Sequence, residues 1–184
     1  MAEILISEVL LERVGFHNAD IWASPLRKAA GLYRIDNRAR TAAFLAQVGH
    51  ESGRLRYARE IWGPTRAQTR YEGRKEMGNT EPGDGKRFLG RGLIQLTGRS
   101  NYRRFTQRMR ERFQDAPDFE ANPVLLEQPL WAALSAGDFW DRMELNPLAD
   151  RMEITLITRR INGGLNGLAE RKALWNKLLQ LLPK

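Results

Sequence analysis

The sequence predicts a mainly α-helical fold with one short β element. Two observations carry this prediction. Apolar residues recur at helical spacing along most of the 184-residue chain, and only one run, Leu93 to Thr97, has the character of a strand. A chain of this length corresponds to one domain and buries a substantial core without disulfide bonds. The chain contains no cysteine, so its core forms without disulfide bonds.

Turn and capping residues set the ends of the expected helices. Gly15 is expected to end the first helix, Pro25 to begin the second, and Asp36 to cap the third. Small residues in the third helix allow a close neighbour, so it is expected to be central. The expected helices are 4–14, 25–31, 37–50, 101–114, 129–143, 150 or 152–161 and 167–182, with a short one near 68–75.

The stretch from residue 61 to residue 92 breaks this pattern, because it is rich in glycine, proline and charge and poor in large apolar residues. An irregular stretch of this length in a compact domain is usually functional or disordered. Residues 61–115 also carry 13 of the 30 basic side chains against 6 of the 22 acidic ones, which accounts for most of the net charge of +8. A cationic surface favours anionic partners, although the same charge also serves solubility.

The composition excludes several kinds of site. Without cysteine there is no thiol nucleophile and no thiolate metal site, and His17 and His50 are the only histidines. No cofactor is therefore expected. No apolar run approaches the length that spans a membrane, and Met1–Val14 lacks the pattern of a secretory signal. Synthesis in the cytoplasm is expected.

Two glutamates are candidate catalytic groups. Glu51 follows a helix of small residues, where the negative end of the helix dipole favours a protonated carboxyl. Glu60 lies nine residues further on. Two carboxyl groups across a cleft can share acid and base work, one protonating a leaving oxygen and the other activating water. The spacing alone also fits two ordinary surface glutamates.

Two further blocks contain polar residues between glycines. In Gly90–Tyr102, Gln95 and Thr97 alternate along the β-prone run and Asn101 starts the next helix. Such side chains suit sugar hydroxyl and acetamido groups, although the block also fits a capped strand-to-helix turn, and it does not match a phosphate-binding loop. The second block is Asn162-Gly163-Gly164, which fits either a helix terminator or a place where Asn162 orders substrate or water.

Taken in order, His50-Glu51-Ser52, the Gly90–Tyr102 block and Ile161–Gly164 resemble glycoside hydrolase family 19, especially short bacterial and phage members that include endolysins. The resemblance covers 36–178. It implies a lysozyme-like helical fold with a cleft between two lobes. Residues 1–184 would then form a single catalytic domain without a separate wall-binding domain.

The resemblance also implies roles for individual residues. Glu51 would be the general acid and Glu60 the general base of an inverting reaction. Thr97 would hold the attacking water. The other expected site residues are His50 supporting Glu51, Gln95, Asn101 and Tyr102 at the sugar, and Asn162 and Arg171 in a polar network behind the site.

Some residues depart from the family pattern. Asn166 stands where plant members carry a glutamate after the Asn-Gly-Gly turn, and the stretch from Glu60 to Gly90 is short. The first departure alters the expected polar network, and the second lowers one wall of the cleft. Because Glu72 and Glu76 lie in the same stretch, either is an alternative base.

The sequence thus favours a hydrolase of peptidoglycan glycan strands, because chitin is uncharged and bacterial envelope polymers are anionic. A monomer, released to the wall by a holin-type partner, fits the resemblance. A chitinase of the same fold is the first alternative. The second is a non-catalytic cationic module that binds a wall or nucleic acid, suggested by arginines 103, 104, 108, 110 and 112, although no nucleic acid is expected as a partner.

Overall fold

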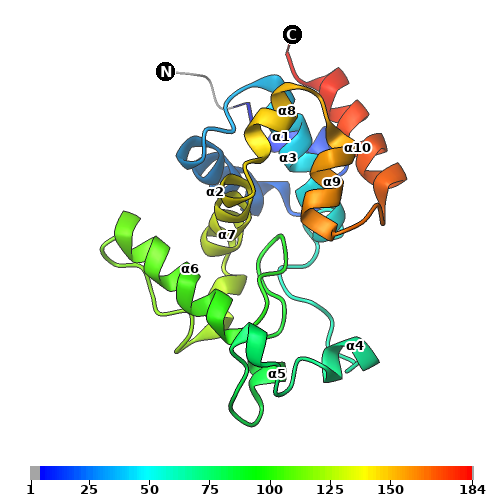
Figure 1. Ribbon diagram of the computed structural model, residues 1–184. Coiled ribbons are helices and arrows are strands. Elements are labelled where there is room, and N and C mark those ends of the chain that lie inside the picture. The colour runs from blue at the N-terminus through cyan, green and yellow to red at the C-terminus, as the bar shows by residue number, and fades with distance from the viewer. Residues whose placement is uncertain (1–4, 184) are drawn as a thin grey trace. The chain divides into compact units, whose positions relative to one another are not determined.

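The computed structural model describes residues 5–183, and helices make nearly all of its regular structure (Figure 1). In this part of the chain the only β pairing outside helices is two isolated bridges, Arg59 with Arg91 and Arg91 with Leu96. The mainly α-helical prediction is confirmed. The expected strand Leu93–Thr97 is wrong, because the chain turns at Gln95, which has a positive φ of 46°.

The chain forms two compact units, the first from residues 5–57 and 136–183 and the second from 58–135. The first unit holds α1 (Glu8–Val14), α2 (Ala19–Leu32), α3 (Arg38–Glu51), α8 (Leu145–Asp150), α9 (Ile154–Asn162) and α10 (Leu168–Leu181). The second holds α4 (Arg66–Thr69), α5 (Asp84–Arg87), α6 (Arg99–Arg112) and two 3-10 helices, Lys75–Met77 and Pro123–Glu127. Helix α7 (Pro129–Arg142) begins in the second unit and ends in the first.

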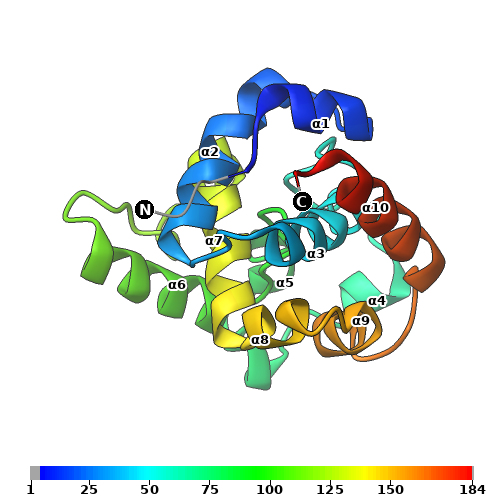
Figure 2. The same ribbon diagram turned by 90° about the horizontal axis from the view of Figure 1, so that it is seen from above.

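Helix α3 is the centre of the first unit. Its residues from Thr41 to Gly49 are all buried, and it lies alongside α10 (Figure 2). Gly49 shows why small residues are needed here: a Cβ at this position would lie 2.7 Å from the Phe16 ring and 3.2 Å from Leu174. The central place expected for this helix is confirmed.

Aromatic side chains form much of the core of the second unit. The rings of Phe105 and Phe119 are 5.0 Å apart, and Trp131 lies 5.3 Å from Phe119 in an edge-on arrangement. The buried hydroxyl of Thr106 on α6 accepts a hydrogen bond from the Phe119 amide at 2.9 Å. These contacts fix α6 against the chain that follows it.

The starts of the first three helices differ from the sequence expectations. Pro25 lies inside α2 and does not begin it, and Asn37, not Asp36, caps α3 by accepting from the Arg40 amide. Asp36 instead forms an ion pair with Arg40 at 3.1 Å. The first expected helix begins at Glu8, capped by Ser7, and its expected start at Ile4 lies outside the described residues.

Helix α8 was not expected, because it is only six residues long and its proline lies in the first turn, where no intrahelical donor is lost. Gly15 ends α1 as predicted, and it adopts the left-handed conformation. No helix in the described part of the chain is both long and apolar enough to cross a membrane.

Candidate active site

Glu51 is the last residue of α3, and its side chain is held by a buried arginine from α10. Arg171 Nη2 donates to Glu51 Oε1 at 2.6 Å, and only 2% of the arginine side chain is exposed. The Arg171 guanidinium also donates to Gln47, whose amide donates to Thr158 on α9 at 3.1 Å. Three helices of the first unit therefore fix one oxygen of Glu51, while Oε2 receives no hydrogen bond from the residues described in that unit.

His50 has a partner other than the one expected. Its Nδ1 lies 2.7 Å from a carboxylate oxygen of Glu170, so the histidine ties the end of α3 to the first turn of α10. Gly167 makes room for this ring, since a Cβ there would lie 2.2 Å from the imidazole. His50 therefore supports the α3–α10 junction, and its expected support of Glu51 stays a prediction.

Asn162 and Arg171 were expected in a polar network behind the site. Arg171 occupies that place, and its burial excludes a direct role in binding substrate. Asn162 ends α9 before Gly163, which has a φ of 70° and closes the helix by bonding to Arg159. Its side chain is exposed, and it bonds to no other described residue. Asn162 is thus observed at the end of a helix, and its role in ordering substrate or water stays a prediction.

Glu60 belongs to the second unit and is held through both carboxylate oxygens. Oε1 accepts from the Gly90 amide, and Oε2 accepts from the Gln68 side chain at 3.1 Å. The Glu60 amide donates back to the Gly90 carbonyl at 2.9 Å. Burial, and then the nearby Glu60 carboxylate, raise the pKa of Tyr71. This arrangement keeps the Glu60 carboxylate in one orientation.

The glycine-flanked block brings two of its predicted residues to Glu60. A Cβ on Gly90 would lie 2.5 Å from Gln95 Oε1 and 3.2 Å from Thr97 Oγ1, so both polar groups lie against the same glycine that bonds Glu60. Gln95 Oε1 is buried and has no hydrogen-bond partner among the described residues. Thr97 donates to the Gln95 carbonyl at 2.9 Å.

Asn101 and Tyr102 both form hydrogen bonds that hold the block, and the sugar contact expected of Asn101 stays a prediction. Asn101 Nδ2 donates to the Thr97 carbonyl at 2.7 Å, and its Oδ1 accepts from Arg104. Tyr102 is fully buried, and its hydroxyl donates to the Leu89 carbonyl at 2.7 Å while accepting from Arg91. Burial raises its pKa. The expectation that Tyr102 binds substrate is wrong, because no face of it reaches the surface.

Glu72 and Glu76, the alternative bases, have other partners. Glu72 accepts hydrogen bonds from the amides of Gly83 and Gly85 at 2.6 and 2.8 Å, which holds the turn before α5. Glu76 is paired with Arg74 at 2.6 Å, and this contact lowers its pKa. Neither carboxylate shares a described partner with Glu60, and the choice of Glu60 as the base stays a prediction.

Gln68 was missed by the functional reading of the sequence. Its signal was the pattern Thr65-x-x-Gln68, which forms a capping box at the start of α4. That motif predicts a helix start. It gives no sign that the glutamine side chain also reaches a candidate catalytic carboxylate.

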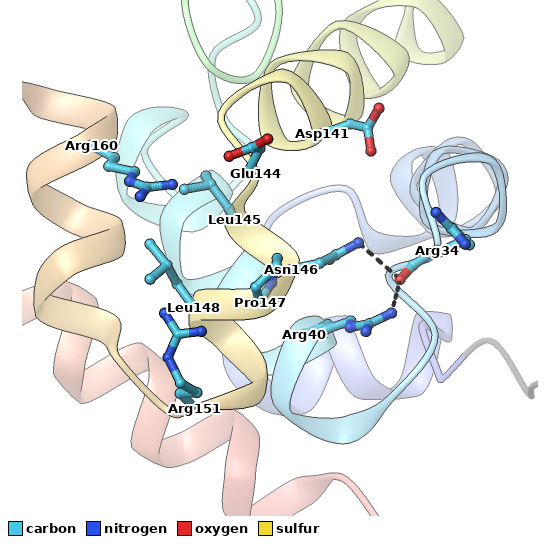
Figure 3. A pocket seen from close by; sticks show the side chains of 10 residues that line it. All are labelled: Arg34, Arg40, Asp141, Glu144, Leu145, Asn146, Pro147, Leu148, Arg151 and Arg160. Carbon is cyan, nitrogen blue, oxygen red and sulfur yellow. Dashed lines mark hydrogen bonds between the residues drawn. The ribbon is translucent and has the colours of Figure 1, made fainter.

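A separate cavity of about 490 Å³ lies in the first unit beside α8 (Figure 3). Its polar groups serve local structure: Asn146 and Arg40 both donate to the Arg34 carbonyl, as the dashed lines show. It contains none of the residues predicted to form the site. It is lined by Arg34, Arg40, Asp141, Glu144, Leu145, Asn146, Pro147, Leu148, Arg151 and Arg160.

The arginines of α6 are largely engaged within the second unit. Arg103 pairs with Glu120 at 2.7 Å, Arg110 with Asp118 at 3.5 Å, and Arg104 donates to Asn101. By contrast, some exposed cations of this unit make no ion pair with a described residue: Arg66, Arg70, Lys75 and Lys86. No group of three or more acidic or histidine side chains in the described ranges could hold a metal ion.

The chain is similar in sequence to known proteins. A glycosyl hydrolase family 19 domain-containing protein of Haemophilus influenzae is 32% identical over 170 residues, with 78% of this chain and 80% of that protein covered. An endochitinase of Arabidopsis thaliana is 30% identical over 150 residues, covering 82% of this chain and 48% of the endochitinase. No protein-family model matches the chain.

Solved structures agree on the fold. Chitinase C from Streptomyces griseus matches with a TM-score of 0.74 at 23% identity, covering 98% of this chain and 78% of the other. A bacterial family 19 chitinase matches with a TM-score of 0.70 at 23% identity, covering 96% and 94%. The fold is the helical, lysozyme-like one of these chitinases. Together with the curated relatives, these matches show that the chain belongs to glycosyl hydrolase family 19 and is a glycoside hydrolase.

Proposed function

We propose that this glycoside hydrolase cleaves the β-1,4 bond between N-acetylmuramic acid and N-acetylglucosamine in peptidoglycan. The observation that carries the choice of substrate is a group of three of the exposed cations without ion pairs in the unit that contains Glu60. Arg66 lies on α4, Arg70 directly follows that helix, and Lys86 lies on α5. Peptidoglycan carries peptide carboxylates, whereas chitin is uncharged. An anionic glycan gains from these cations, and chitin does not.

The proposed chemistry is an inverting hydrolysis. Glu51 gives its proton to the glycosidic oxygen as the bond to the anomeric carbon breaks, and Oε2 is the oxygen available for this because Arg171 occupies Oε1. Glu60 takes a proton from the water that attacks the anomeric carbon from the other face. The two carboxyl groups of such a pair stand about 6.5–9.5 Å apart.

Thr97 suits the role of holding that water. Its hydroxyl proton is committed to the Gln95 carbonyl, which leaves the oxygen to accept a hydrogen bond from the water. The contacts through Gly90 place Thr97 in the same small cluster as Glu60. The water would lie between the threonine oxygen and the carboxylate.

Digestion of purified sacculi tests the proposal. The wild type is expected to produce new muramic acid reducing ends, and Glu51→Gln and Glu60→Gln to produce none above background. Glu72→Gln is the matched control, because it changes the same charge on a carboxylate that holds a turn. New glucosamine reducing ends would show that the enzyme cleaves the other glycosidic bond of the glycan strand. Lytic activity in Glu51→Gln would show that Glu51 is not the general acid.

A chitinase of the same mechanism is the alternative, favoured by the relative called an endochitinase. Cleavage of chitin oligomers without cleavage of sacculi would establish it. The non-catalytic cationic module loses its main support because the α6 arginines are engaged by neighbouring residues. Salt-resistant DNA binding with no glycan cleavage would revive it.

The proposal extends to the place of action. Peptidoglycan lies outside the cytoplasmic membrane, so a protein made in the cytoplasm reaches it through a release partner of the holin type. Lysis by expression inside cells, with and without a permeabilised inner membrane, tests this step. Equal lysis in both would remove the need for such a partner.

A further inference from the structure

We propose that Gln68 is the positioning residue of Glu60: its amide holds the carboxylate in the orientation from which it takes a proton from water. The proposal rests on the function proposed for Glu60. It adds a residue to the reaction, and it concerns only groups within the second unit.

The side chain of Gln68 is fully engaged. Its Nε2 donates to Glu60 Oε2 at 3.1 Å and to the Ile61 carbonyl at 2.8 Å. Its Oε1 accepts from the amides of Gly63 and Thr65 at 3.1 and 2.8 Å. A primary amide offers two donors and two acceptor positions, and all four are used. Gln68 is also buried, with 6% of its surface exposed.

These four bonds join the candidate base to the loop that follows it. The Gly90 amide fixes Glu60 Oε1 and Gln68 fixes Oε2, so the plane of the carboxylate is set by two donors. The same amide closes the loop over residues 61–65, which carries Ile61 with 73% of its surface exposed. A rigid loop with an exposed apolar side chain beside a fixed carboxylate fits a surface made for a ligand.

Replacing Gln68 with glutamate tests the role sharply. Gln68→Glu keeps the acceptors for the loop amides and puts a second carboxyl against Glu60. At high pH both are ionised and repel, so Glu60 is displaced. At low pH the pair shares a proton, and the introduced carboxyl can donate to Glu60 Oε2 as the amide did.

Other charged groups near the pair do not interfere with this readout between pH 5 and 8. The pKa of Tyr71 and that of Tyr102 are raised, and that of Asp84 is lowered, so these three keep their ordinary charge in that range. One further carboxylate lies in the turn after α4: Glu72, which accepts hydrogen bonds from the amides of Gly83 and Gly85 and not from Gln68 or Glu60. The other charged groups on α4, α5 and this turn are basic: Arg66, Arg70, Arg74, Lys86 and Arg87.

The first measurement is kcat against pH on a soluble glycan substrate. We expect Gln68→Glu to lose about 100-fold at pH 8 and about 10-fold at pH 5, with KM changed little, because a small misplacement of a catalytic group has effects of this size. Gln107→Glu, an exposed site on α6 with the same change of charge, should follow the wild type. A constant ratio of variant to wild type across pH would overturn the proposal.

A second measurement does not depend on activity. The exchange variant Glu60→Gln with Gln68→Glu restores one amide and one carboxylate to the contact. Its melting temperature at pH 8 should lie closer to the wild type than that of Gln68→Glu alone. If Gln68→Glu alone fails to fold, the exchange variant should still fold. Equal melting temperatures of the two variants at pH 8 would contradict the contact between Gln68 and Glu60.

The outcomes separate this inference from the proposed function. Full activity in Glu60→Gln would show that Glu60 is not the general base. The positioning role of Gln68 would then be overturned as well. An inactive Glu60→Gln together with a pH-independent effect of Gln68→Glu would leave the base in place and overturn only the positioning role.

Discussion

Arg171 links the stability of the first unit to its candidate acid. The guanidinium is buried and serves Gln47 and Glu51 together, so it has no substitute once removed. Removing one partner of a buried ion pair lowers the free energy of unfolding by far more than the intact pair adds to it. The reason is that the remaining charge is buried without a partner.

We therefore expect Arg171→Met to lower the free energy of unfolding by about 3 kcal/mol. Arg159→Met, at an exposed arginine on α9, should stay within about 0.5 kcal/mol of the wild type. Urea unfolding at neutral pH compares the three proteins. Equal midpoints would show that the buried network carries no net stability.

Gly167 shows a second way in which one residue sets the site. Its φ is 72° and its missing side chain leaves space for His50, so two separate penalties apply to any Cβ there. Gly163 has nearly the same φ, at 70°, with nothing within 4 Å. The two glycines therefore separate backbone strain from steric conflict.

Gly163→Ala is expected to cost about 1 kcal/mol of stability, from backbone strain alone. Gly167→Ala should cost about 3 kcal/mol, because it also displaces the His50 ring and its contact with Glu170. Thermal unfolding of both variants checks the difference. Equal losses would mean that the imidazole moves aside freely.

Asp84 of α5 anchors α6. Its carboxylate pairs with Arg99, at the start of α6, and accepts from the Glu81 amide at 3.0 Å. Burial raises the pKa of Asp84, but the hydrogen bonds from Arg99 and the backbone lower it by more, so the pKa is below its ordinary value. A lowered pKa means that the ionised form stabilises the fold.

This gives a stability that depends on pH with a defined sign. The contribution of Asp84 is complete above the unfolded value of about 3.9 and is lost as pH falls through the lower folded pKa. Asp84→Asn should be less stable than the wild type at pH 7. The difference in free energy of unfolding between the two proteins should become smaller below pH 4. Guanidinium unfolding at both pH values tests this, with exposed Glu111→Gln as control. A gap that stays constant would contradict the assignment.

The elements also show what the sequence could predict. Long helices with clear caps were predicted to within a few residues, as for α7 from Pro129. The start expected at Pro25 was wrong, although proline generally favours the first turn of a helix. Here the buried side chains of Trp22 before it and Leu26 after it keep α2 continuous. Local propensity gives way where burial on one face is strong.

The site was predictable where a motif carried it and hidden where tertiary contacts made it. Glu51 and Thr97 could be proposed from two short blocks, and Glu60 from its position nine residues after Glu51. The partner of His50 could not, because Glu170 lies 120 residues away in sequence. Tyr102 was misassigned because a motif shows which residues recur together but not which of them are buried.

The basic side chains of the second unit fall into two classes, those with a carboxylate partner and those without one. Arg99, Arg103 and Arg110 of α6 pair with carboxylates of their own unit, so they add less to the external field than their number suggests. Arg66, Arg70 and Lys86 have no such partners in the described structure and act outward. The substrate preference should therefore follow these three residues and not the net charge.

Neutralising them together as Arg66→Gln, Arg70→Gln and Lys86→Gln should raise the KM for sacculi about 10-fold at low salt and leave cleavage of uncharged chitin oligomers unchanged. The difference should shrink as salt rises, because charges on the surface are screened beyond about 8 Å at physiological ionic strength. Arg13→Gln, Arg27→Gln and Lys172→Gln remove the same charge from the first unit and serve as the control. If both triple variants lose activity on sacculi equally, the field of the whole protein steers the substrate. If neither does, the cations do not distinguish peptidoglycan from chitin, and the chitinase alternative gains.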